Sequence, residues 1–343
     1  MSDRKLLCII TPNSQTPSFR YRIRQYFPYL EKAGFHPKAL EIQRLTSQKV
    51  SRFKNVFDDA GIIFLQKKLL NKRESSLISE WREKIVLDLD DALFVPAFNE
   101  PKGLFGFVKR FSKWNRFINT VQTCSFIICA NTYLAQKCRE AGNDNILILP
   151  TPVPLERYSP KSFDQPRKDP FILGWIGTPG NLRYLEPLRP VLAQLHKKFP
   201  VVLRIISSAR PAITECPLEF KEWKLEEEAE DLKALDAGIM PLTDDPWTQG
   251  KAGFKLLQYM AAGLPSVSSS VGINKGIIQN GVNGFLAETM EQWGSILEKL
   301  AKDRELCKVT GANARATVEK HYSLDVLAPA ILDFLHHFTG NRD

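Results

Sequence analysis

The sequence predicts an α/β protein made of two Rossmann-like domains that face each other across a cleft. Short apolar runs alternate with helical segments twice along the 343 residues, as in parallel sheets covered by helices on both faces. That length also exceeds what one hydrophobic core usually supports. Between the two series lies "PTPVPLERYSPKSFDQPRKDP", which has six prolines and little periodicity. We therefore expect domains over 1–150 and 171–325, a linker over 151–170 and a C-terminal helix over 326–343.

The expected strands follow one another in order along the chain. Those of the first domain are "KLLCIIT", "GIIFLQ", "KIVLDLD", "SFIICA" and "NILILP", with an early strand that begins near His36. Those of the second domain are "PFILGWIG", "VVLRIISS", "DAGIMPL" and "PSVSSSV". After Glu288, repeated apolar spacing predicts helices as far as the C-terminus.

The positive charge is concentrated in the first half of the chain. The net charge is +9, and residues 1–150 carry 24 Lys and Arg against 14 Asp and Glu, a balance of +10. This half is therefore expected to meet an anionic partner, such as a membrane surface, a nucleic acid or a phosphorylated acceptor. The six cysteines include no C-x-x-C pair, which favours buried free thiols over disulfides or a zinc site.

No targeting or membrane-spanning signal is evident. The apolar run Leu6 to Ile10 is too short for a signal peptide, and no stretch approaches the roughly 20 residues that cross a bilayer. We expect a cytoplasmic protein.

The stretch "QGKAGFKLLQYMAAGLPSVSSSVG" predicts an anion site. Apolar residues recur at helical spacing from Phe254, and Gly263 with Pro265 ends the helix before a strand. A loop with Gly253 before the helix directs free N–H groups at one spot, where Lys251 and Lys255 add positive charge. The alternative is that both lysines are solvated ends of an ordinary αβ unit.

Two further segments of the second half carry candidate ligand contacts. In "GWIGTPGNLRYLEPL", Gly177 and Thr178 follow a strand directly and would let a ligand approach the backbone. Trp223 precedes an acidic helix. The acidic residues of that helix are expected to form a solvated face: Glu226, Glu227, Glu228, Glu230 and Asp231.

One long segment resembles a known family. "DAGIMPLTDDPWTQGKAGFKLLQYMAAGLPSVSSSVGINKGIIQNGVNGFLAE" is similar to the nucleotide-binding domain of the retaining GT-B glycosyltransferases of family 4, the glycosyl transferases group 1. "SFRYRIRQYFPYLEKAGF", "IIFLQKKLL", "LDLDDALF" and "ILPTPV" resemble the N-terminal domain of one bacterial branch of that family.

The resemblance implies a metal-independent, hexosyltransferase-like enzyme that needs no cofactor. It would transfer a sugar from a nucleotide diphosphate-sugar to an acceptor hydroxyl, with retention, in polysaccharide or glycoconjugate assembly. The residues assigned to binding of the sugar donor, from the motifs above and from this resemblance, comprise the glycine loop and helix start, the first-loop positions, the ribose position and Trp223. They are Gly177, Thr178, Arg183, Trp223, Lys251, Gly253, Phe254, Lys255 and Gln258, with Lys255 in the catalytic role.

The sequence departs from the family at its E-x7-E motif. Gln258 stands at the second glutamate, which holds the ribose, and Gly250 stands at the first. Gln258 retains hydrogen-bonding capacity without a charge. The family's sugar-contacting histidine is also missing, because His36 belongs to an early strand.

Acidic residues at the end of "LDLDDALF" offer a replacement. Asp88, Asp90 and Asp91 end a strand whose carboxyl edge should face the cleft, and we assign Asp90 and Asp91 to acceptor or sugar hydroxyls, in the catalytic group. Asp88 and Asp90 also imitate the D-x-D metal motif of the GT-A fold. That interpretation is disfavoured because the second half supplies a GT-B nucleotide site.

The basic surplus points to the acceptor side. Arg20 and Arg22 follow the first strand, where they would meet an anionic acceptor. The segment 104–118 predicts an amphipathic helix with a basic margin and Phe105 or Trp114 at an interface, suited to an anionic membrane. The alternative is a core helix with a basic outer face. One face of this predicted helix, apolar except for Asn115, comprises Leu104, Phe107, Val108, Phe111, Asn115 and Ile118.

Two other classes of protein compete with a transferase, and a third is disfavoured. A degenerate sugar-nucleotide-binding protein would bind nucleotide without turnover, and it fits the missing glutamates and histidine. A nucleic-acid-binding protein would use the same charge, but no RNA or DNA motif accompanies it. A nicotinamide oxidoreductase lacks support, because neither half has G-x-G-x-x-G between a first strand and helix.

Overall fold

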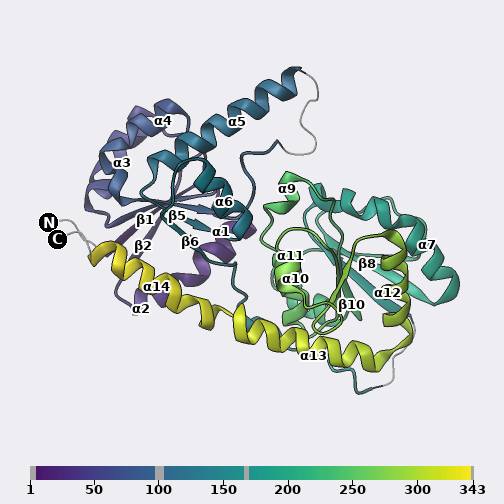
Figure 1. Ribbon diagram of the computed structural model, residues 1–343. Helices are drawn as coiled ribbons and strands as arrows, with labels where there is room; N and C mark the ends of the chain where they lie inside the picture. The colour runs from purple at the N-terminus through teal and green to yellow at the C-terminus, as the bar shows by residue number, and fades with distance from the viewer. Residues whose placement is uncertain (1–4, 97–103, 166–169, 341–343) are drawn as a thin grey trace. The chain divides into compact units, whose positions relative to one another are not determined.

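The computed structural model describes residues 5–96, 104–165 and 170–340, and they form two compact α/β units (Figure 1). Unit 1 is discontinuous in sequence: Met1–Pro152, Asp245–Ala252 and Leu324–Asp343. Unit 2 takes the remaining segments, Val153–Asp244 and Gly253–Ser323. Two parallel sheets flanked by helices confirm the predicted fold class.

Unit 1 contains a six-stranded parallel sheet in the order β2-β1-β3-β4-β5-β6. Alternate residues of β1 enter different apolar layers, since Leu7 and Ile9 pack on one face while Cys8 and Ile10 pack on the other. The strands are β1 (Leu6–Thr11), β2 (His36–Glu41), β3 (Ile62–Gln66), β4 (Ile85–Leu89), β5 (Phe126–Cys129) and β6 (Ile146–Ile148).

Helices cover both faces of this sheet (Figure 1). One layer contains α3 (Ser47–Asp59), α4 (Lys72–Leu77), η2 (Ser79–Lys84), α5 (Leu104–Thr123) and α6 (Thr132–Glu140). The other contains α1 (Pro17–Arg22), η1 (Arg24–Tyr26), α2 (Phe27–Lys32) and α14 (Leu324–Gly340). The short α9 (Pro246–Gln249) also belongs to unit 1.

Unit 2 contains a second six-stranded parallel sheet, in the order β12-β11-β10-β7-β8-β9. Its strands are β7 (Phe171–Ile176), β8 (Val201–Ser207), β9 (Leu218–Glu222), β10 (Ala237–Met240), β11 (Ser266–Ser269) and β12 (Phe285–Ala287). Its helices are η3 (Leu155–Arg157), η4 (Pro179–Leu188), α7 (Arg189–Lys198), α8 (Glu228–Lys233), α10 (Phe254–Ala261), α11 (Asn274–Ile277), α12 (Met290–Lys302) and α13 (Arg304–His321).

The proline-rich segment differs from the linker that the sequence predicts. Its first residues, up to Pro152, belong to unit 1. Its described remainder belongs to unit 2, where Val153, Tyr158 and Phe163 are buried in the core. An extended, proline-rich chain has no periodic pattern of apolar residues. The sequence pattern therefore does not indicate that Tyr158 and Phe163 are buried. The predicted C-terminal helix likewise belongs to unit 1, because α14 buries Ala328 and Leu335 there.

The six cysteines are buried free thiols, as predicted. In the described part of the chain, no helix has both the length and the apolar character needed to cross a membrane.

Candidate functional site

The loop before α10 has the geometry that the sequence predicts for an anion site. Gly253 caps the N-terminus of α10 with a φ of 69°, in the left-handed region that favours glycine. A Cβ atom there would also lie 2.7 Å from Cδ1 of Ile277. The turn therefore requires glycine, and the N–H groups of the first turn of α10 point out of the helix end.

Lys255 brings a positive charge to the same place. Its Nζ atom lies 4.1 Å from the ring centroid of Trp175, a cation–π contact that holds the ammonium at the carboxyl end of β7. A Cβ atom at Gly177 would lie only 2.2 Å from that Nζ. Gly177, Gly253 and Lys255 thus combine a bare backbone, a helix N-terminus and a cation, which suits a phosphate.

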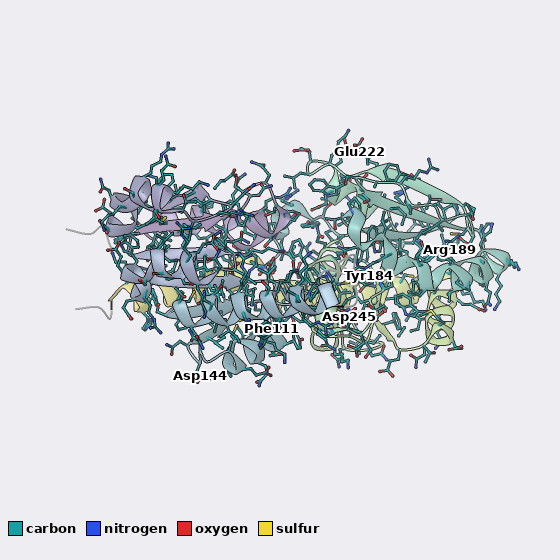
Figure 2. All side chains as sticks on the ribbon, turned by 90° about the horizontal axis from the view of Figure 1, so that it is seen from above. Phe111, Asp144, Tyr184, Arg189, Glu222 and Asp245 are labelled. Carbon is teal, nitrogen blue, oxygen red and sulfur yellow. The ribbon has the colours of Figure 1, made fainter. Side chains whose placement is uncertain are left out.

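The other residues that the sequence predicts to bind the nucleotide-sugar lie in different surroundings. Thr178 is exposed, and Phe254 is half-buried against the core of unit 2. Arg183 donates a hydrogen bond from Nη2 to Oη of Tyr184 at 2.8 Å. Both residues belong to η4, and Figure 2 labels Tyr184. Lys251 belongs to unit 1, where its Nζ lies 5.6 Å from the Trp247 ring centroid.

Gln258 lies in a buried hydrogen-bond network with Glu228. Gln258 Nε2 donates to Glu228 Oε1 at 2.9 Å and to Tyr158 Oη at 3.0 Å. Tyr158 Oη donates to Glu228 Oε1 at 2.8 Å, and Trp223 Nε1 donates to Glu228 Oε2 at 2.8 Å. The carboxylate of Glu228 thus links Trp223 and Gln258, which are both predicted to bind the nucleotide-sugar.

The burial of Glu228 corrects the expectation of a wholly solvated acidic face. Its side chain is 3 % exposed, whereas Glu226 and Glu230 are exposed as expected. Nothing in a run of consecutive glutamates distinguishes the one that faces inward, because that choice depends on Tyr158 and Gln258.

A second polar cluster lies at the carboxyl ends of β1, β3 and β4 in unit 1. Thr11 Oγ1 donates to Gln66 Oε1 at 2.9 Å, and Gln66 Nε2 donates to Ser18 Oγ at 2.8 Å. Ser18 Oγ then donates to Asp90 Oδ2. Ser18 and Gln66 are residues that sequence reasoning missed, since their single polar side chains carry no motif.

Lys67 binds both predicted acids of this cluster. Its Nζ forms an ion pair with Asp91 and lies 3.6 Å from Asp90 Oδ1. Burial opposes the charge of Lys67, but Asp90 and Asp91 outweigh it and raise the lysine's pKa. Burial would raise the pKa of Asp90, yet Lys67 and the Ser18 hydroxyl lower it overall. Lys67 and Asp90 are therefore both charged at neutral pH.

Two features set this cluster apart from an ordinary ion pair. The backbone of Lys67 has a φ of 51°, a left-handed conformation that costs energy for a residue other than glycine. Asp90 Oδ1 is buried and accepts no hydrogen bond within the described structure. This oxygen faces the Lys67 charge but accepts no hydrogen bond, so it is suited to accept one from a hydroxyl group.

Arg22 is in the interior of unit 1, which corrects its predicted place on the acceptor side. It is 4 % exposed, its Nη2 lies 2.5 Å from Asp88 Oδ1, and its Nη1 donates to the Leu149 carbonyl at 2.6 Å. Arg20 is half-buried, with its guanidinium 5.6 Å from the ring centroid of Tyr21. Asp88 therefore faces Arg22, while Asp90 faces Ser18 and Lys67.

The helix α5 divides into an exposed and a packed half. Val108 is 58 % exposed and Phe111, which Figure 2 labels, is 61 % exposed. Lys109 and Arg110 beside them are also exposed. Toward its C-terminus, Phe117 is fully buried. Trp114 packs 5.3 Å from the Phe117 ring centroid, away from the predicted interface. The side chains of Leu104, Phe105 and Phe107 lie outside the described part of the structure.

Comparison with known proteins agrees with the fold. Residues 172–303, which are less than half of the chain, match the family model of glycosyl transferases group 1. No curated protein matches the sequence. Within the described residues, no group of His, Cys, Asp and Glu side chains is arranged to hold a metal ion.

Solved structures with the GT-B fold match nearly the whole chain. Sucrose-phosphate synthase from Thermosynechococcus elongatus has a TM-score of 0.73 at 13% identity, covering 98% of this chain and 99% of that one. Anabaena HepE in complex with UDP and glucose has a TM-score of 0.70 at 13% identity, covering 96% and 99%. WaaG, a glycosyltransferase involved in lipopolysaccharide biosynthesis, has a TM-score of 0.63 at 15% identity, covering 96% and 99%.

Proposed function

We propose that this protein is a retaining glycosyltransferase that moves a sugar from a nucleoside diphosphate-sugar to an acceptor hydroxyl. The observation that carries the proposal is the cradle of Gly177, Gly253 and Lys255 at the carboxyl end of β7. It lies in the segment that matches glycosyl transferases group 1. HepE, which shares the fold, binds UDP and glucose in its own structure.

The proposed reaction places the developing charge at this cradle. The bond between the anomeric carbon and the diphosphate oxygen breaks, and the leaving diphosphate takes the electron pair. The acceptor oxygen attacks from the same face, and its proton passes to a phosphate oxygen. Lys255 and the N–H groups at the start of α10 stabilise the charge on the leaving group, which requires no protein nucleophile or metal.

We propose that unit 1 binds the acceptor through the cluster of Ser18, Lys67, Asp90 and Asp91. Asp90 Oδ1 would accept a hydrogen bond from an acceptor or sugar hydroxyl, while Lys67 keeps the carboxylate ionised. Arg20 stays a candidate contact for an anionic acceptor. The biological setting that we propose is polysaccharide or glycoconjugate assembly in bacteria. WaaG, which shares the fold, is a glycosyltransferase involved in lipopolysaccharide biosynthesis.

Thermal unfolding of the purified protein against UDP, GDP, ADP, dTDP and CMP tests the proposal. One nucleoside diphosphate, at about a hundred times its dissociation constant, should add about 2.7 kcal/mol to the free energy of unfolding. The sugar nucleotide of that base should then lose its sugar to an added acceptor or to water. Binding without any turnover would favour a degenerate sugar-nucleotide-binding protein. Gln258 and Gly250, which replace the family's two glutamates, are the reason to consider that alternative. No binding would refute both.

We also propose that the exposed half of α5 contacts an anionic membrane. Val108 and Phe111 beside Lys109 and Arg110 combine apolar insertion with attraction to acidic lipids. The double variant V108S/F111S should bind vesicles containing phosphatidylglycerol at least about tenfold more weakly, because burying each side chain is worth about 1.5–3 kcal/mol. Co-sedimentation measures this.

The matched control for the membrane proposal is Val309→Ser, on α13 of unit 2, where Val309 is 49 % exposed without forming part of α5. It should bind vesicles like the wild type, and vesicles of phosphatidylcholine alone should bind none of the proteins. Equal sedimentation of V108S/F111S and the wild type would rule out this surface.

A further inference from the structure

We propose that the packed half of α5 positions Lys67 at the proposed acceptor site, with Thr120 as the main positioning residue. The inference rests on the proposed function, because it concerns the cluster of Lys67, Asp90 and Asp91 in unit 1. Two observations carry it: the left-handed backbone of Lys67, and the side chains of α5 that bind the backbone just after it.

Lys67 stands at a turn that the chain does not adopt unaided. It is the only described residue other than glycine with a positive φ, and such a conformation persists where the surroundings enforce it. At this turn two adjacent lysines separate. Lys67 forms an ion pair with Asp91, whereas Nζ of the buried Lys68 donates to the Gln43 carbonyl at 2.8 Å.

One face of α5 binds the residues that follow this turn. Thr120 Oγ1 accepts a hydrogen bond from the Leu70 N–H at 2.7 Å, and Asn119 Nδ2 donates to the Leu70 carbonyl at 3.3 Å. Arg116 Nη2 donates to the Leu69 carbonyl at 2.6 Å. Positions 116, 119 and 120 lie three and four residues apart, so they share one face of the helix. The segment after Lys67 is therefore fixed by α5.

Thr120 makes the most protected of these contacts. Thr120 and Leu70 are both fully buried. The Thr120 hydroxyl donates to the Arg116 carbonyl at 2.6 Å, so it meets the Leu70 N–H with a lone pair. A buried N–H group without an acceptor is unfavourable. Loss of the hydroxyl should therefore shift Leu70, and Lys67, three residues earlier, should shift with it.

The place of Lys67 determines the charge of the acceptor cluster. Its Nζ lies 3.6 Å from Asp90 Oδ1, the oxygen that we propose for an acceptor hydroxyl. Burial opposes the charge of both groups, but their attraction outweighs it, so the pKa of Lys67 is raised and that of Asp90 is lowered. Without the ammonium, burial and Asp91 would favour a protonated Asp90, which is a poorer acceptor. Thr120 thus acts through Lys67.

Competitive acetylation of the full-length protein with acetic anhydride at pH 8, followed by mass spectrometry, tests the position of Lys67. Only the neutral amine reacts, so Lys67 in the wild type should react more slowly than the exposed Lys32 of the same unit. In Thr120→Val, the rate at Lys67 relative to Lys32 should rise about tenfold, the equivalent of a pKa lower by one unit. Thr120→Ser keeps the hydroxyl and should react like the wild type.

A second variant tests the same face from an exposed position. Arg116→Met removes the donor to the Leu69 carbonyl, and because Arg116 is exposed the variant should fold. The relative rate at Lys67 should rise about threefold, the equivalent of half a pKa unit.

Two control variants separate positioning from a general loss of stability. Val121→Ala truncates a fully buried side chain of α5 that makes none of these hydrogen bonds. It should lower the urea midpoint of unfolding while leaving the relative rate at Lys67 unchanged. Thr123→Val removes a hydroxyl that bonds only the Asn119 carbonyl within α5, and it should also react like the wild type.

The outcomes distinguish this inference from the proposed function. An unchanged rate at Lys67 in both Thr120→Val and Arg116→Met overturns the inference, and so does an equal rise in Val121→Ala. In an assay of sugar transfer, Thr120→Val should raise the KM for the acceptor without changing the dissociation constant of the nucleoside diphosphate, because the phosphate cradle belongs to unit 2. A wild type that binds no nucleoside diphosphate overturns the proposed function, whatever the rate at Lys67.

Discussion

Replacing Lys255 by alanine is expected to remove most of the stabilisation that a nucleoside diphosphate gives to the protein. A hydrogen bond to a charged group contributes about 1.5–3 kcal/mol, so the dissociation constant should rise about 10- to 150-fold. At a ligand concentration that adds about 2.7 kcal/mol to the wild type, a hundredfold weaker variant gains only about 0.4 kcal/mol. Thermal unfolding with and without the nucleotide measures the difference.

The structure offers a control and a second route to the same effect. Lys275→Ala removes an exposed lysine from α11 of the same unit and should leave nucleotide binding unchanged. Gly177→Ala should weaken binding as Lys255→Ala does, because its methyl group would lie 2.2 Å from the Lys255 Nζ and displace the ammonium. If Lys255→Ala bound the nucleoside diphosphate with wild-type affinity, Lys255 would not bind the phosphate and the main support for the proposed function would be lost.

The parts of the site that the sequence predicted share a local cause. The start of α10 follows from Gly253 and the apolar spacing after it, and the position of Lys255 follows from that start. A strand, a glycine and a helix lie close together along the chain, so their geometry is largely encoded by neighbouring residues. The same holds for Asp90 and Asp91, which directly follow the buried strand β4.

The parts that the sequence did not predict depend on contacts between distant residues. Glu228 is buried because Tyr158 and Gln258, 70 and 30 residues away, direct polar groups at it. Arg22 and Arg20 belong to one basic run, and only the pairing with Asp88, 66 residues away, determines which of them is internal. Charge patterns report how many charged residues a segment has, and tertiary packing decides which of them remain available to a ligand.

Replacing Arg22 by methionine should lower the free energy of unfolding by about 3–5 kcal/mol, because it leaves Asp88 buried without its cation. That is a large share of the ~5–15 kcal/mol by which proteins are stable. The control Arg24→Met changes an exposed arginine of the same run and should cost less than about 1 kcal/mol. Urea unfolding of the three proteins measures these differences.

The pH dependence of the Arg22→Met variant distinguishes a buried ion pair from a surface contact. Burial already raises the pKa of Asp88 despite the opposing charge of Arg22, and loss of that charge should raise it further. The folded variant then binds a proton that the unfolded chain does not, so its free energy of unfolding rises as the pH falls. The deficit relative to the wild type should be larger at pH 8 than at pH 5. A variant with wild-type stability and weakened acceptor binding would instead place Arg22 at the acceptor.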